Sequence, residues 1–279
     1  MDALRDSNWL LLAAAALLNL ISLAAKSMSW CLLLRRLAPL RAGTAQAATF
    51  VGAAVNSISV SVSGEVARAQ LAVTRDKVPF GAAVASLLVS RVVEALGLVL
   101  FLSLAFVLLP PWPGARMIGL ALAGGAAATV LGYRLVPWGR LHARALGRWH
   151  DTFIRMAASK DRGGLGGALA FATCNWIAQW FTYHWSMAAT HVAVTPAVSL
   201  MALVLANLVG ILRLTPGNIG VLQGSLVVGM RAFEIPAANA LAAGLALQAV
   251  QVLPVLAIGM AIVGRQGFRS LAARRTPAL

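Results

Sequence analysis

Apolar residues dominate this chain in long uninterrupted runs, and polar residues gather in short clusters between them. A run of about 20 apolar residues is long enough to cross the hydrocarbon core of a bilayer as a helix. The pattern predicts such helices over five stretches, at residues 9–25, 81–109, 117–136, 165–189 and 237–263.

Two further apolar stretches are interrupted by helix-breaking or small residues. The first break is Ser-Val-Ser-Gly-Glu at 61–65, and the second is Thr-Pro-Gly-Asn-Ile-Gly at 215–220. A second short apolar run follows each break. Non-helical backbone at membrane depth is tolerated only where protein or a water-filled cavity satisfies its polar groups. A matched pair of broken segments therefore points to a substrate site.

The overall composition agrees with a polytopic membrane protein. The chain is 60% hydrophobic and only 11% charged, and its mean hydropathy is +0.82. Its net charge of +15 could indicate nucleic acid as a partner. The basic residues punctuate the apolar runs, however, which is a topology signal, so we expect no nucleic-acid partner.

The positive-inside rule discriminates between two layouts. If both broken segments return to the side they came from, eighteen of the 23 basic residues share one side, including the cluster from Lys26 to Arg41. Three then lie on the other side. If both segments cross the membrane, the two sides carry 12 and 9 basic residues. The strong bias favours the first layout, with the N-terminus outside and the C-terminus in the cytoplasm.

This layout predicts an all-α polytopic membrane protein, with about five full transmembrane helices and two re-entrant broken-helix hairpins. It forms one membrane domain over residues 1–279. The order of long span, broken hairpin and long span occurs at about 8–109 and again at about 165–263, linked by the span at 117–136. An odd number of crossings separates the two halves, which predicts an inverted-topology repeat.

A basic amphipathic segment at 138–160 follows the linking span. Apolar residues recur there at helical spacing, while Arg140, Arg144 and Arg148 form a stripe on another face. We interpret it as a helix lying on the anionic cytoplasmic leaflet. A solvated basic loop that acts only as a topology signal is the alternative.

Carboxylates are rare, and two of the eight occupy unusual positions. Glu65 lies at the first break, three residues before Arg68. Glu94 lies well inside the 81–109 span, three residues after Arg91. Because charge inside a membrane usually faces the protein interior and pairs, we predict one polar cluster of these four residues, with Gly64 beside it. The alternative is an ion-pair lock that holds the hairpin against the neighbouring span.

The second break has a different character. Pro216 and Gly217 end one arm, and Gly220 allows close backbone approach before the next. A helix that starts there would present its N-terminal amides to an anion, with Arg213 adding a cation. The alternative for Arg213 is snorkelling to the interface. Neutral polar residues add hydrogen-bonding groups around both breaks: Asn56, Asn207, Gln223, Gln248 and Gln251.

Motifs of soluble enzymes are missing from the sequence. It contains no phosphate-binding loop, no His-Glu-x-x-His and no Gly-x-Ser-x-Gly. The four histidines do not stand at metal-ligand spacing from carboxylates or cysteines. We therefore expect no enzymatic activity, no catalytic residue, no metal site and no cofactor.

Four pieces of sequence resemble a known family of membrane proteins. They begin with Lys26-x-x-x-Trp30 and Ser63-Gly-Glu-x-x-Arg68, and continue with Arg91-Val-Val-Glu94 and the Pro-Gly-Asn-Ile-Gly-Val run at 216–221. The family is the lysylphosphatidylglycerol synthase transmembrane region, also called flippase-like. The resemblance covers nearly the whole chain, and the aminoacyl-transfer domain of fused members has no counterpart in it.

The resemblance implies a bacterial cytoplasmic membrane protein that handles a lipid and moves it between leaflets. Its ligand would be an anionic phospholipid or a polyprenyl phosphate headgroup. The chain departs from the family at the first break, and it has Gln223 where an acid is usual and Gln248 where an arginine is frequent. These departures leave the lipid open. The alternative is a non-transporting accessory subunit of a lipid-modifying enzyme or glycosyltransferase.

Overall fold

The computed structural model describes residues 7–59, 63–108, 115–135, 162–210 and 215–275, and every regular element among them is helical. This confirms the all-α class. The described residues of each of the five predicted spans lie in one helix. Five helices account for them: α2 (Trp9–Leu34), α5 (Phe80–Leu108), α6 (Ala115–Leu135), α8 (Arg162–Ala189) and α11 (Ala237–Arg275).

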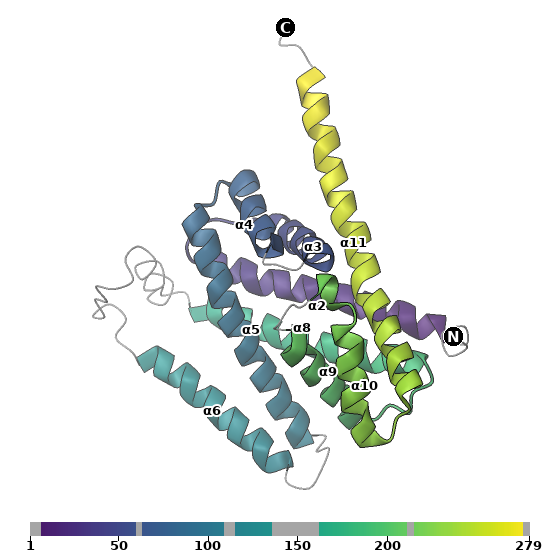
Figure 1. Ribbon diagram of the computed structural model, residues 1–279. Helices are drawn as coiled ribbons and strands as arrows, with labels where there is room; N and C mark the ends of the chain where they lie inside the picture. Colours follow the sequence, from purple (N-terminus) through teal and green to yellow (C-terminus); the bar gives the residue numbers. More distant parts are fainter. Residues whose placement is uncertain (1–6, 60–62, 109–114, 136–161, 211–214, 276–279) are drawn as a thin grey trace.

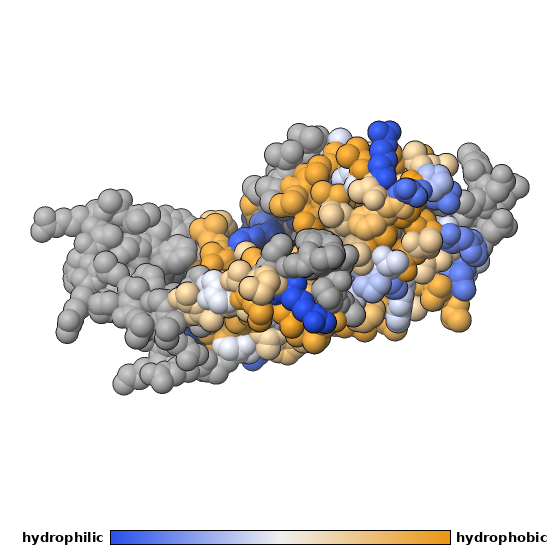
Figure 2. Space-filling view, turned by 90° about the horizontal axis from the view of Figure 1, so that it is seen from below, coloured by the Kyte–Doolittle hydropathy of each residue, from blue (hydrophilic) through white to orange (hydrophobic). Residues whose placement is uncertain are grey.

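Three helices in the described part of the chain are both long and apolar enough to cross a membrane. They are α2, α5 and the first 29 residues of α11. Large apolar side chains are exposed along them, among them Trp9 at 71% and Leu253 at 64%. Among the coloured residues in Figure 2, hydrophobic ones predominate, and hydrophilic ones form separate patches. Such a surface is suited to lipid and not to water.

The first helix is longer than the sequence predicted. We expected an apolar span at 9–25 that continues into Lys26 and Trp30, and α2 extends to Leu34. The residues after Lys26 are buried: Trp30, Leu33 and Leu34 are each 0% exposed. Lys26 therefore lies inside a helix and does not belong to the loop charges. The charge count had grouped Lys26 with the basic residues on one side of the membrane, whereas the structure places it within the helix, where a paired charge can stay.

Helices α2 and α8 pack side by side through the middle of the molecule (Figure 1). Ser29 Oγ donates to the carbonyl oxygen of Ala168 at 2.8 Å, and Thr182 Oγ1 lies 3.5 Å from that of Ala15. These contacts show that the two helices run antiparallel. Small side chains let the backbones approach closely, as is usual where lipid supplies no hydrophobic drive between helices.

The first break separates two short helices, α3 (Ala42–Ile58) and α4 (Ser63–Asp76), which pack against each other as an antiparallel hairpin. They cross closely at two glycines: a β-carbon at Gly52 would lie 2.6 Å from the carbonyl oxygen of Gly64. Near the break, the Gly64 amide donates to Asn56 Oδ1 at 3.1 Å. Asn56 thus satisfies one of the free amides at the start of α4.

The open end of this hairpin is held by Asp76. Its carboxylate accepts from the Arg41 amide at 2.7 Å and from Thr44 Oγ1 at 3.0 Å. Arg41 Nη2 lies 2.7 Å from the same carboxylate. The start of α3 is therefore fastened to the end of α4.

We expect Asp76→Asn to destabilise the protein only above the acidic range. Burial by itself would raise the pKa of Asp76, but hydrogen bonds from Arg41 and Thr44 outweigh it and lower the pKa. A lowered pKa stabilises the folded state above the unfolded value of about 3.9, and the stabilisation is lost as the pH falls through the folded pKa. Melting in detergent should show the variant roughly 2–4 °C below the parent at about pH 6. A gap that persists below the folded pKa would contradict this origin.

The second break lies between α9 (Pro196–Gly210) and α10 (Val221–Met230), and contains the short turn η2 (Pro216–Asn218). Three of the described residues there have positive φ: Gly217 at 59°, Asn218 at 56° and Gly220 at 83°. A second turn, η3 (Arg231–Phe233), leads from α10 to α11. α9 and α10 pack against each other and against α8 and α11, around the fully buried Leu203, Leu226 and Leu247.

The two breaks meet in space. η2 packs against α3, and a β-carbon at Gly217 would lie 2.7 Å from the carbonyl oxygen of Ser57 at the end of α3. Only glycine combines this close approach with a positive φ. The turn of the second break thus lies against the end of α3, the helix that leads into the first break. Arg213 and the amphipathic segment at 138–160 lie outside the described residues.

Candidate functional site

A cavity of about 1110 Å³ lies where the two breaks meet. The first break contributes Glu65 to its walls, and the second contributes Gly217 and Asn218. Residues of α2, α3, α4, α5, α8, α9, α10 and α11 complete the lining. Its volume is slightly larger than the range of about 300–1,000 Å³ that is usual for ligand sites.

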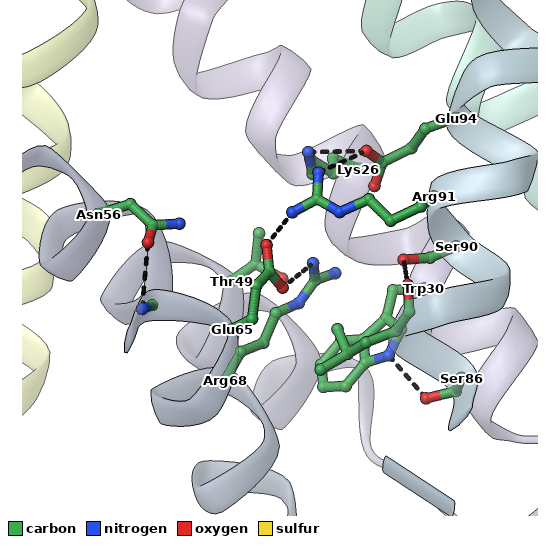
Figure 3. A network of polar contacts seen from close by, with 12 residues as sticks. Lys26, Trp30, Thr49, Asn56, Glu65, Arg68, Ser86, Ser90, Arg91 and Glu94 are labelled. Carbon is green, nitrogen blue, oxygen red and sulfur yellow. Dashed lines mark hydrogen bonds and ion pairs between the residues drawn. The ribbon is translucent and has the colours of Figure 1, made fainter. Parts of the chain in front are cut away.

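One wall of the cavity is an ion-pair network (Figure 3). Lys26 Nζ donates to Glu94 Oε2 at 2.9 Å, and Arg91 Nη1 donates to the same oxygen at 3.3 Å. Arg91 Nη2 also donates to Glu65 Oε1. Arg68 Nη1 lies 3.8 Å from Glu65 Oε2. The network joins α2, α4 and α5, and it brings together the four charged residues that the sequence predicted.

The network carries one more positive charge than negative charge. Its cations are Lys26, Arg68 and Arg91, and its anions are Glu65 and Glu94. Both carboxylates already face cations. The Arg91 side chain is 45% exposed, whereas those of Lys26 and Arg68 are only 24% and 4% exposed. Arg91 is therefore the cation best placed to meet an incoming ligand.

Arg68 lies behind the cavity and does not line it. Its side chain is 4% exposed, and its guanidinium carbon lies 4.2 Å from the centre of the Trp30 ring. Trp30 is held in turn by Ser86, whose Oγ accepts from the indole at 2.9 Å. Nε and Nη2 of Arg68 have no hydrogen-bond partner among the described residues. A cation stacked on a buried indole is stabilised by the negative face of the ring.

A second wall is made of neutral amides. Gln179 Nε2 donates to Ser22 Oγ at 2.8 Å and to Asn19 Oδ1 at 3.3 Å. Gln251 Nε2 donates to Gln179 Oε1 at 3.3 Å, and Asn19 Nδ2 donates to the Gln251 carbonyl oxygen at 3.3 Å. These bonds join α2, α8 and α11. They lie on the same cavity as the charged wall, since Asn19, Gln179 and Gln251 line it.

The second break is organised by two glutamines. Gln248 Nε2 donates to the carbonyl oxygen of Gly217 at 2.8 Å, and Gln223 Oε1 accepts from the Gly220 amide at 2.7 Å. Gln248 lines the cavity, whereas Gln223 is buried beside it. Gln223 therefore acts as a cap at the start of α10.

The predicted site residues separate into three groups. Glu65, Arg91, Glu94 and Gly217 line the cavity. A second group supports the cavity from behind or from the breaks: Gly64, Arg68, Pro216, Gly220 and Gln223. Arg213 belongs to the residues that the structure does not describe.

Sequence reasoning missed Lys26, Asn19 and Gln179 as site residues. Lys26 was counted as a loop charge, although it lines the cavity and binds Glu94. Asn19 and Lys26 are seven residues apart on α2 and share one face of the helix. Two polar residues on one face of an otherwise apolar helix could have identified both as site residues. Among the described residues, no three His, Cys, Asp or Glu side chains are grouped so as to hold a metal ion.

The motifs quoted from the sequence converge on this site. Lys26, Glu65, Arg68, Arg91 and Glu94 come from three separate motifs and form one network. No curated protein matches the chain. The family model described as the lysylphosphatidylglycerol synthase TM region matches residues 1–259. With its apolar helices, this makes the protein a multi-pass membrane protein. The chain belongs to the lysylphosphatidylglycerol synthase transmembrane-region family.

Proposed function

We propose that the protein binds a lipid by its headgroup in the central cavity and moves it between the leaflets of the bacterial cytoplasmic membrane. One observation supports this above all others: the cavity combines an ion-pair wall, in which Arg91 is the most exposed cation, with exposed apolar side chains. An anionic headgroup would be held at Arg91, and would offset the extra positive charge that the buried Arg68 gives to the network behind the wall.

The acyl chains would leave the cavity along its apolar rim. Three large side chains that line it are more than half exposed: Phe80 at 53%, Leu88 at 51% and Leu208 at 58%. These residues belong to α5 and α9. A lipid could therefore keep its chains in the bilayer while its headgroup occupies the polar interior.

The membrane layout of this proposal makes both hairpins re-entrant, with the N-terminus outside and the C-terminus in the cytoplasm. α3 and α4 have 17 and 14 residues. At 1.5 Å per residue they measure roughly 25 and 21 Å, less than a hydrocarbon core of about 30 Å. Their antiparallel packing also supports a return to one side. The breaks would then lie at membrane depth beside the cavity, where broken backbone is tolerated.

An inverted repeat is supported by matched packing in the two halves. The first helix of each half packs against its own hairpin and its own closing helix: α2 against α3 and α5, and α8 against α9 and α11. In repeats of this kind the substrate site lies between the halves. A lipid site in the central cavity would agree with that rule.

The alternative of a non-transporting accessory subunit receives less support. A subunit that acts only through its outer surface needs no polar interior, and a closed interior would have favoured that alternative. The cavity of about 1110 Å³ favours a protein that takes a ligand inside. We also propose that the protein is not an enzyme, since the polar groups of the cavity are largely engaged with one another.

Arg91→Gln is expected to reduce lipid translocation at least ten-fold, because it removes the most exposed cation of the network. The assay uses purified protein in vesicles that contain phosphatidylglycerol with a fluorophore on one acyl chain. Bleaching by external dithionite then reports how fast inner-leaflet lipid becomes accessible. Glu65→Gln should also slow the rate, because Glu65 holds Arg91 in place.

The matched control is Arg116→Gln, which removes an exposed cation of α6 that does not line the cavity. It should translocate at the parent rate. If the parent protein moves no lipid in this assay, or if Arg91→Gln and Arg116→Gln behave alike, the proposed function is wrong.

A further inference from the structure

A second pocket lies outside the central cavity, at the open end of the first hairpin. Its volume is about 720 Å³, and it shares no lining residue with the central cavity. The lining comes from the segment between α2 and α3 and from the end of α4: Arg35, Pro39, Leu40, Arg41, Arg75, Asp76 and Lys77. The proposed function makes no use of this pocket.

The pocket lies where two candidate membrane spans end. Arg35 directly follows α2, and Lys77 stands three residues before the start of α5. Both helices are long and apolar enough to cross a membrane. Trp30, near the end of α2, donates to Ser86 Oγ, near the start of α5, at 2.9 Å, so these two ends lie together. The pocket is therefore at the level where the spans leave the hydrocarbon core, which is the level of phospholipid headgroups.

Positive charge is in excess in this pocket. Among the described residues that line it, four are cations and Asp76 is an anion. The Asp76 carboxylate is already engaged, since it accepts from the amide and from Nε of Arg41, at 2.7 and 2.9 Å. The lining thus carries three more positive than negative charges, whereas the described lining of the central cavity has two of each.

The cations of the pocket are accessible to a ligand. Arg35 Nε donates to the carbonyl oxygen of Leu40 at 2.8 Å. This bond orients the guanidinium and uses one of its five N–H donors. The Arg41 side chain is 75% exposed although it is paired, and Lys77 is exposed. Charged donors of this kind form the short, strong hydrogen bonds that phosphate oxygens accept.

Helix ends account for only part of this arrangement. Arg35 and Lys77 follow the ends of α2 and α4, where a cation complements the negative end of the helix dipole. Arg41 occupies the opposite position, because it is the N-cap of α3, where the dipole disfavours a cation. An anion in the pocket would be attracted to all of these residues.

We propose that this pocket binds the phosphate headgroup of an anionic phospholipid, at a site separate from the central cavity. Basic pockets beside membrane helices hold anionic lipids in this way. An acyl chain could leave the pocket against Phe80, which begins α5 three residues after Lys77 and is 53% exposed. The inference goes beyond the proposed function and does not require that the protein moves lipid.

Lipid binding to the full-length protein tests the inference without a transport assay. The experiment uses Arg91→Gln throughout, because this change removes the cation of the proposed site in the central cavity. Native mass spectrometry in detergent measures the binding of phosphatidylglycerol, which is anionic, and of phosphatidylcholine, which has no net charge. We expect phosphatidylglycerol to bind at least ten-fold more tightly.

Arg35→Gln combined with Lys77→Asn removes two cations from the pocket. Asparagine is chosen at position 77 because it tolerates the positive φ of 56° found there. Since each cation near a membrane surface contributes to the binding of anionic lipid, phosphatidylglycerol should bind roughly ten-fold more weakly. The matched control is Arg116→Gln combined with Arg231→Gln, which removes two exposed cations outside both pockets and should bind like its parent.

The inference is overturned if the parent binds the two lipids equally, or if the pocket variant binds phosphatidylglycerol as tightly as the control. A pocket variant that melts earlier but binds like the control would show that these cations serve the helix ends alone. Release of phosphatidylglycerol by excess inorganic phosphate, at constant ionic strength, would assign the pocket to a soluble phosphate.

A single substitution keeps the test decisive if the double variant does not fold. Lys77→Asn alone should weaken the binding of phosphatidylglycerol several-fold, and unchanged binding would count against the inference. Each of these results is read from binding and not from transport. Absence of translocation would therefore overturn the proposed function and leave this site standing, and loss of this site would leave the proposed function standing.

Discussion

Glu94→Gln is expected to destabilise the protein by about 2–3 kcal/mol, although the side chain keeps its size. Glu94 is 7% exposed and holds both Lys26 and Arg91. Without its charge, three cations face only Glu65. Removing one partner of a buried pair costs about 3–5 kcal/mol, and solvent around Lys26 and Arg91 reduces this value. Unfolding in mixed detergent micelles measures the difference.

A second substitution tests whether the unpaired positive charge causes the loss of stability in Glu94→Gln. Lys26→Gln added to Glu94→Gln restores the original net charge, so the double variant should be more stable than Glu94→Gln alone. This coupling is the quantity that a double-mutant cycle isolates. Glu234→Gln is the control, because Glu234 is exposed outside the network, and it should change stability by less than about 0.5 kcal/mol. If Glu94→Gln is as stable as this control, the network does not stabilise the fold.

Gly64→Ala is expected to prevent normal assembly of the first hairpin. A β-carbon at position 64 would overlap the carbonyl oxygen of Gly52 and the side-chain amide of Asn56. A backbone carbonyl cannot rotate away as a flexible side chain can. Overpacking usually costs about 1–3 kcal/mol, and a clash with backbone belongs at the upper end. Separation of α3 from α4 would also displace Glu65, so translocation should fall together with stability.

Gly43→Ala in the same hairpin provides the control. A β-carbon there meets nothing within 4 Å, and the helix should gain up to about 1 kcal/mol because alanine is the better helix former. Size-exclusion profiles and melting points of the two variants in one detergent make the comparison. Equal behaviour of Gly64→Ala and Gly43→Ala would show that α3 and α4 do not cross closely.

The two breaks have unequal roles in this structure. The first break places Glu65 at the cavity and is stabilised by Asn56 and by the glycine crossing. The second contributes backbone and neutral amides, with Gln248 bound to Gly217. Charged side chains that line the cavity therefore come from α2, α4 and α5, whereas uncharged hydrogen-bonding groups come from α2, α3, α8, α9, α11 and η2.

Much of the site could be predicted because charge in an apolar chain is rare and informative. Arg91 and Glu94 stand in an apolar run, and Glu65 and Arg68 stand at a break, so each was identified without a structure. Lys26 was missed because it stands near the end of its apolar run and not in the middle. A charge near the end of an apolar run is ambiguous between a loop and a buried pair, and only its partner decides.

The sequence by itself determined that the chain is helical, that it belongs in a membrane and where its apolar stretches break, because hydropathy and helix-breaking residues act locally. Only the tertiary structure decided which polar groups meet. Lys26 binds Glu94 across 68 residues, and Asn19 binds the backbone of Gln251 across 232. Such pairs depend on how each helix is rotated and where helices cross, and the packing of small residues along whole helices sets both.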